Sequence, residues 1–100
     1  MEKSFIEMSS DKKYKELFID VSDYEQPEPF EKVIQLLFKM NRGEYIRMHH
    51  RKKPLPLIQF IQENGFDCIV HQGSEIPWEI IIWHKTDLEV EQYCLTQFPA

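Results

Sequence analysis

The chain has 100 residues, 42% of them hydrophobic, and a formal net charge of −5 at pH 7. This length and apolar content are typical of one globular domain that buries its own core, and they exclude a disordered chain. The acidic balance argues against a nucleic-acid-binding domain, which would normally be basic.

The two cysteines, Cys68 and Cys94, form no CxxC motif and no zinc-finger spacing with histidine. We therefore expect reduced thiols and no disulfide framework. Residues 1–7 contain no apolar segment of the signal-peptide type, and the longest apolar run, residues 80–83, is too short to cross a bilayer. These features predict a cytoplasmic protein without membrane association.

Composition divides the chain into three parts. Residues 1–15 are polar and charged, which predicts a flexible leader. Residues 16–84 form the predicted folded domain, which opens with a short strand over residues 16–21. Residues 85–100 form a C-terminal tail, which is either a short docking helix or frayed. Its apolar residues have helix-like spacing: Val90, Tyr93, Cys94 and Phe98.

Two prolines, Pro27 and Pro29, predict the start of the first helix. Proline is tolerated there because the first helical residues have no partner for an amide proton. Gly43 can adopt the left-handed conformation that ends a helix. The apolar residues between these points recur every three or four positions: Phe30, Val33, Ile34, Leu37 and Met40. This spacing predicts one buried helix face.

The second half of the domain repeats the pattern of strand and helix. Pro54 and Pro56 open the second predicted helix, and Gly65 ends it. The predicted elements are a strand over residues 44–49, a helix over 57–64, a strand over 66–71 and a strand over 77–84.

The element order β-α-β-α-β-β predicts an α+β fold. Each strand–helix–strand unit should form a right-handed parallel crossover, and the last two strands should form an antiparallel hairpin. Both helices then lie on one face of the sheet, which gives a two-layer sandwich. The fourth strand is the most apolar, so we place it centrally, with the strand order 1-2-4-3.

Residues 19–29 read I-D-V-S-D-Y-E-Q-P-E-P. This segment resembles the L-D-x-R-G-L-x-C-P-x-P motif of the TusA/SirA sulfur-carrier family, with matches at Ile19, Asp20, Pro27 and Pro29. The motif lies at the same place, where the first strand leads into the first helix. The resemblance covers about residues 17–84 and implies the same fold.

In that family, the cysteine before the proline carries a persulfide. This chain has Gln26 at the matching position, so the resemblance does not imply persulfide transfer here. The chain is more similar to a branch of uncharacterised bacterial domains that keep the fold and lack the cysteine. In that branch, a basic or histidine-bearing loop leads into a Pro-x-Pro-Leu helix start, as residues 50–57 do here.

A basic run precedes the second helix. Its cations and the free amides of a helix start could bind a phosphate, a carboxylate or an acidic partner; the alternative is a solvated loop. The candidate ligand-binding residues lie in this run and at the start of the first helix: Gln26, Glu28, His50, Arg51, Lys52 and Lys53.

Strand alternation predicts that His49, Glu79 and His71 lie in one row on the sheet face away from the helices. Two histidines and a carboxylate form a known ligand set for iron or zinc, and a histidine–glutamate pair could also transfer protons. The alternative is an ordinary polar sheet face, because a one-residue slip in register would move His49 to the other face and bring in His50. Apart from iron or zinc at this row, no cofactor is expected.

The same open face should carry an apolar patch formed by Tyr45, Ile69, Ile81 and Trp83. Such a patch is typical of an interface with a protein partner or a second copy. The alternative is that one end of the chain covers it, with Tyr93 and Phe98 of the tail in contact with the sheet.

The sequence therefore favours a non-catalytic or accessory binding module for a protein partner or small anion. The alternative is a metal- or proton-handling protein that uses His49, His71 and Glu79.

Overall fold

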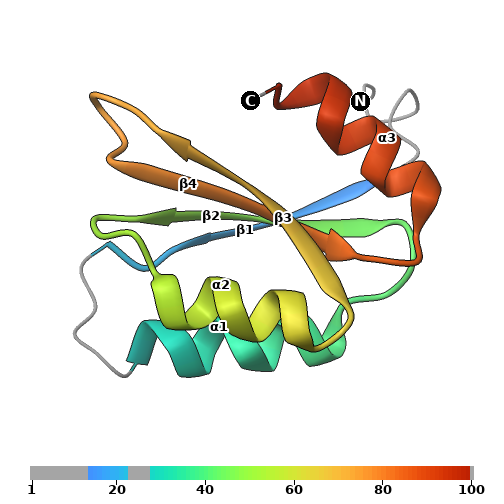
Figure 1. Ribbon diagram of the computed structural model, residues 1–100, viewed down its shortest axis with the longest axis horizontal. Coiled ribbons are helices and arrows are strands. Elements are labelled where there is room, and N and C mark those ends of the chain that lie inside the picture. Colours follow the sequence, from blue (N-terminus) through green and yellow to red (C-terminus); the bar gives the residue numbers. More distant parts are fainter. Residues whose placement is uncertain (1–13, 23–27, 100) are drawn as a thin grey trace, which may run out of the picture.

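The computed structural model of the protein describes residues 14–22 and 28–99 (Figure 1). The candidate ligand residue Gln26, the side chain of Glu28 and the first 13 residues of the expected leader lie outside this description. The elements are β1 (Lys15–Asp20), α1 (Glu28–Lys39), β2 (Glu44–His50), α2 (Leu55–Glu63), β3 (Phe66–Gln72), β4 (Trp78–His84) and α3 (Leu88–Gln97).

The strands form a mixed sheet in the order β1-β2-β4-β3. β1 and β2 are parallel, and β4 is antiparallel to both β2 and β3. The predicted α+β fold and strand order are confirmed. β4 is central because its side chains are apolar on both faces, and Ile80, Ile81 and Ile82 are completely buried.

α1 and α2 lie side by side on one face of the sheet (Figure 1). They bury the helix-side core, which includes Val33, Leu37 and Ile61 together with Ile46 and Ile80 of the sheet. No helix in residues 14–22 and 28–99 is long and apolar enough to span a membrane.

Two turns of positive φ separate these helices from the strands that follow. Gly43 (φ 85°) connects α1 to β2, and Gly65 (φ 87°) connects α2 to β3. Glycine adopts this conformation without the steric cost that a Cβ would bring. α2 begins at Leu55, two residues earlier than predicted, because Pro54 is its N-cap residue and Pro56 lies within its first turn.

The tail contains α3, which lies on the sheet face opposite α1 and α2 (Figure 1). Asp87 caps this helix: its carboxylate accepts hydrogen bonds from the Val90 amide (3.4 Å) and from the Gly43 amide (2.8 Å). Val90 and Cys94, one helical turn apart, are both fully buried against the sheet. α3 therefore adds a partial third layer to the predicted sandwich.

Candidate functional site

The predicted polar row is present on the sheet face opposite α1 and α2. In the strand register, Glu79 of β4 pairs with His49 of β2 on one side and with His71 of β3 on the other. The separation of neighbouring strands, about 4.8 Å, brings the three side chains within reach of one another. We call His49, Glu79 and His71 the histidine–glutamate strip.

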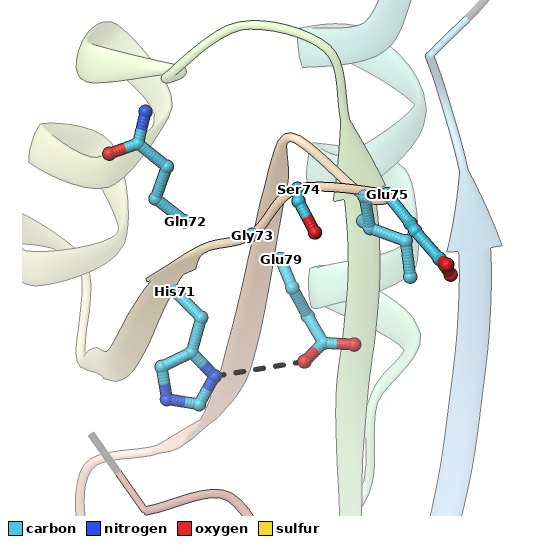
Figure 2. A pocket seen from close by; sticks show the side chains of 7 residues that line it. His71, Gln72, Gly73, Ser74, Glu75 and Glu79 are labelled. Carbon is cyan, nitrogen blue, oxygen red and sulfur yellow. Dashed lines mark ion pairs between the residues drawn. The ribbon is translucent and has the colours of Figure 1, made fainter.

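Glu79 is the centre of this strip. Its Oε2 atom lies 2.9 Å from Nε2 of His49 and accepts a hydrogen bond of 2.6 Å from Nε of Arg47. Its Oε1 atom is 3.7 Å from Nδ1 of His71 (Figure 2). Arg47 also lies 3.8 Å from the carboxylate of Glu16, so the guanidinium joins two carboxylates.

The charges in the strip keep Glu79 ionised. Burial alone would raise the pKa of Glu79, but the hydrogen bonds and charges of Arg47 and His49 outweigh it and hold this pKa below its usual value. An ionised Glu79 can accept a hydrogen bond from Nε2 of His49 when that nitrogen carries the ring proton. The rings of Phe18 and His49 meet edge to face at a centroid distance of 4.8 Å. The contacts with Glu79 and Phe18 therefore fix the position of the His49 ring.

A metal ion fits this arrangement less well. The Oε2 atom of Glu79 is already shared by the Arg47 guanidinium and His49, and the guanidinium would repel a cation placed between the two histidines. In the described part of the chain, no group of three or more His, Cys, Asp or Glu residues could hold a metal ion.

A pocket of about 270 Å³ lies beside the strip, under the turn that joins β3 and β4. His71 and Glu79 line it from the strands, and Ser74 and Glu75 line it from the turn (Figure 2). Ile76 also lines the pocket. Figure 2 shows the Glu75 carboxylate pointing outward, away from His71. The pocket presents the imidazole of His71, the hydroxyl of Ser74 and the carboxylate of Glu79 beside apolar surface, so it offers a few hydrogen-bonding groups to a small ligand.

The structure covers the apolar patch that the sequence suggested as an interface. α3 and its flanking residues pack over it, and the exposed fractions of its residues are Tyr45 3%, Ile69 8%, Ile81 0% and Trp83 2%. The aromatic rings of Tyr93 and Phe98 lie 5.7 and 5.8 Å from that of Tyr45. These four residues are therefore core residues in this structure and not an exposed contact surface.

His50 also differs from its predicted place in the basic run. β2 continues through His50, so strand alternation turns its side chain toward α1 and α2, and only 2% of the residue is exposed. Its Nδ1 atom accepts the Lys52 amide proton at 3.1 Å, and its buried Nε2 atom has no partner in residues 14–22 and 28–99. Burial and the neighbouring cations Arg51 and Lys52 lower the pKa of His50. It is a buried neutral imidazole and not a surface ligand.

The other residues of the basic run, Arg51, Lys52 and Lys53, are exposed. Nζ of Lys53 lies 5.6 Å from the centre of the Trp78 ring, a cation–π distance. The start of α2 offers few free amide donors, because Pro54 and Pro56 have none and the Leu55 amide donates to the Lys53 carbonyl. The groups of this loop that are available to an anion are therefore the side-chain cations and not the helix amides.

Neither cysteine has the properties of a reactive thiol. Burial raises the pKa of Cys68 to about 11 and that of Cys94 to about 12. Cys68 packs against the helix-side core, and Cys94 lies on the buried side of α3, against the sheet. Both remain protonated at neutral pH and cannot act as nucleophiles.

Arg47 is the site residue that the sequence analysis missed. No role was assigned to it from the sequence. Residues i and i+2 of a strand lie on one face, so a cation two positions before His49 could have been expected to reach Glu79 on the neighbouring strand.

A comparison with known protein families gives one match, over residues 18–84. This segment runs from β1 to the end of β4 and leaves out α3. No curated protein and no solved structure was found to match the chain. The family match covers well over half of the chain, and the chain therefore belongs to the family described as uncharacterized conserved protein (DUF2249).

Proposed function

We propose that this protein is a non-catalytic binding module of TusA-like fold that binds an acidic ligand, either a segment of a partner protein or a small anion. Sulfur transfer would need a thiolate at the start of α1, where the sequence has Gln26. Of the two thiols that the chain does have, Cys94 is buried and Cys68 is partly buried, and their pKa values are raised. A binding role agrees with a scaffold that lacks the nucleophile.

The binding surface that we propose lies at one end of the sheet, where the β2–α2 loop and the β3–β4 turn lie next to each other (Figure 1). The observation that carries this assignment is the contact between Lys53 and Trp78, because it joins the two connections into one surface. We call this the loop-end surface, and it consists of Arg51, Lys52, Lys53, Leu55, Ile76 and Trp78.

The chemistry of the loop-end surface defines the ligand. It concentrates cations in a protein whose net charge is −5. Two exposed apolar side chains accompany them, Leu55 with 61% and Ile76 with 36% of their surface exposed. Cations beside apolar side chains favour a ligand that carries both carboxylates and apolar groups, such as an acidic, leucine-containing peptide.

Titration monitored by nuclear magnetic resonance tests this proposal. The two tryptophan indole signals serve as reporters, because Trp78 belongs to the loop-end surface and Trp83 is buried under α3. We expect a Glu/Leu peptide to shift the Trp78 signal, with an affinity that falls as salt is added, and to leave Trp83 unchanged. Inorganic phosphate, titrated separately, shows whether a small anion is enough.

The matched variants are Lys52→Glu/Lys53→Glu and, as a control, Lys85→Glu. Lys85 is exposed at the opposite end of β4, and its Nζ atom contacts the Gln62 carbonyl at 3.3 Å. The double variant should abolish the Trp78 shift and the control should preserve it. Equal effects of both variants, or no shift of Trp78 with either ligand, would contradict the proposal.

The alternative function is proton or metal handling at the histidine–glutamate strip, and the 2.9 Å contact between His49 and Glu79 supports its proton part. Metal analysis of untagged protein and of His49→Ala tests the metal part. Stoichiometric iron or zinc that is lost in the variant would favour it over the binding module. Solvent exchange of the His49 ring N–H proton, followed by NMR in the wild-type protein and in Glu79→Gln, tests the proton part, which predicts faster exchange in the variant.

A further inference from the structure

β3 is an edge strand of the sheet, and no strand within residues 14–22 and 28–99 pairs with its outer side. An uncovered edge presents backbone donors and acceptors that can pair with another chain. Proteins commonly protect such edges with lysine, proline or a bulge. The sequence of β3, FDCIVHQ, contains neither lysine nor proline.

Every second residue of β3 points its backbone groups toward this edge. The Lys85 amide donates to the Gly65 carbonyl, so the odd-numbered residues exchange hydrogen bonds with β4. Accordingly, the Cys68 amide does not reach β4, and it donates to its neighbour's carboxylate, Oδ1 of Asp67, at 2.8 Å. The residues whose amide and carbonyl groups face the edge are Phe66, Cys68, Val70 and Gln72.

The strand is complementary to itself when two copies run antiparallel about Ile69. This register uses all of β3 and places the outward groups of Cys68 opposite those of Val70 in the other copy, as an antiparallel ladder requires. On the face that carries the strip, it places Asp67 of each copy opposite His71 of the other. A carboxylate can accept a hydrogen bond from an imidazole directly opposite it, and such a polar cross-strand pair stabilises a strand pair.

The two edge strands of the sheet, β1 and β3, differ in how well each can pair with the same strand of a second copy. β1 is the other edge, and its outward residues are even-numbered, since the Val21 amide donates to the His49 carbonyl. Antiparallel self-pairing of β1 about Phe18 would place Glu16 opposite Asp20 of the second copy. Like charges in direct opposition are destabilising, so β1 is protected against self-pairing and β3 is not.

We propose that β3 is a homodimer interface, in which two copies pair their β3 strands antiparallel about Ile69 and form one continuous sheet. In this dimer, the Cys68 amide donates its hydrogen bond to a backbone carbonyl of the second copy and no longer to the Asp67 carboxylate. The Asp67 carboxylate is then free to face His71 of the second copy. The Nε2 atom of His71 is buried without a partner among the described residues. His71 then lies between Glu79 of its own chain and a carboxylate of the other, so the dimer extends the histidine–glutamate strip.

Sedimentation of the full chain tests the pairing. We expect a species of twice the 12.1 kDa chain mass at about 100 µM protein, a range where weak pairs associate. Val70→Pro should give a folded monomer, because the Val70 amide faces outward and its loss breaks no hydrogen bond to β4. Phe18→Pro is the matched control on the β1 edge and should remain dimeric. Circular dichroism and buried-type Trp83 fluorescence verify that each variant is folded.

Exchanging the side chains of Asp67 and His71 tests the pairing of the two β3 strands about Ile69, even if the proline variant does not fold. Asp67→His and His71→Asp each place like side chains opposite one another, and each should weaken the dimer roughly two- to thirtyfold. The double variant restores two opposed pairs and should regain most of the affinity. A wild-type monomer at this concentration, a folded Val70→Pro dimer, or a double variant no tighter than the single variants would overturn the proposal.

Discussion

Glu79→Gln isolates the charge at the centre of the histidine–glutamate strip. Glutamine keeps the size of the side chain but replaces the anion that Arg47 and His49 contact at 2.6 and 2.9 Å. A hydrogen bond to a charged group contributes about 1.5–3 kcal/mol and a neutral one about 1 kcal/mol, so each contact loses roughly 0.5–2 kcal/mol. The Arg47 side chain is 34% exposed, which places its share at the lower end. We expect the free energy of unfolding at pH 7 to fall by about 1–3 kcal/mol.

The pH dependence of this loss identifies its cause. The pKa of Glu79 is lower in the folded protein than its ordinary value of 4.5. Its charge therefore stabilises the fold fully above pH 4.5, and this contribution is lost as the pH falls through the folded-state pKa. The difference between the wild-type protein and Glu79→Gln should be largest near neutral pH and should shrink progressively below pH 4.5.

Urea unfolding followed by tryptophan fluorescence measures both effects. With a slope of about 1–3 kcal/mol per molar urea, the midpoint at pH 7 should shift by roughly 0.5–1.5 M. Glu75→Gln is the matched control, since Glu75 is exposed in the adjacent turn and should change stability by less than about 0.5 kcal/mol. Equal stabilities of Glu79→Gln and wild type at pH 7, or a difference of the same size at pH 3.5, would refute this account of the strip.

Three further predictions concern residues outside the strip. Because the pKa of His50 is lowered in the folded protein, the unfolded chain binds a proton more readily, and the free energy of unfolding should fall as the pH drops below 6.5. His50→Gln should reduce this dependence of the unfolding free energy on pH, as measured by urea unfolding at several pH values. An unchanged pH dependence would contradict this role of His50. Asp87→Ala removes the cap of α3 and should cost about 1–2 kcal/mol in thermal unfolding, whereas Asp87→Asn, which keeps the acceptor, should lose much less; equal losses would show that the cap is unimportant. Cys68 and Cys94 should react with a thiol reagent at pH 8 much more slowly in the native state than in urea; fast native reaction would mean that a thiol is accessible.

The topology of the sheet could be predicted from the sequence because the residues that mark helix ends and the apolar pattern of the strands are local and mutually consistent. Pro54, Gly43 and Gly65 mark helix ends with backbone requirements that few other residues meet. The apolar run in β4 identifies the central strand. Once the strand order is known, alternation places His49 and His71 on one face, which is why the strip could be predicted without coordinates.

The place of His50 was predicted wrongly, and the cover over Trp83 was left open between two alternatives, of which the contact of Tyr93 and Phe98 with the sheet is confirmed. His50 was assigned to the basic loop because three cations follow it, but β2 extends one residue further than expected and turns the ring inward. The cover over Trp83 depends on tertiary contacts. α3 buries few of its own residues, among them Val90 and Cys94, so its sequence has too weak an apolar face to indicate where it packs.

Arg47 connects the strip to α3, and this decides which substitution tests the strip. Its guanidinium bonds to Glu79 and also lies 5.7 Å above the ring of Phe98, the residue that ends α3. Removing Arg47 would therefore weaken the strip and loosen the end of α3 together, and the two losses could not be separated. Glu79 contacts Arg47, His49 and His71 of the sheet, and its replacement by glutamine leaves the Arg47–Phe98 stacking in place. A loss of stability that follows the charge of Glu79 can thus be assigned to the strip itself.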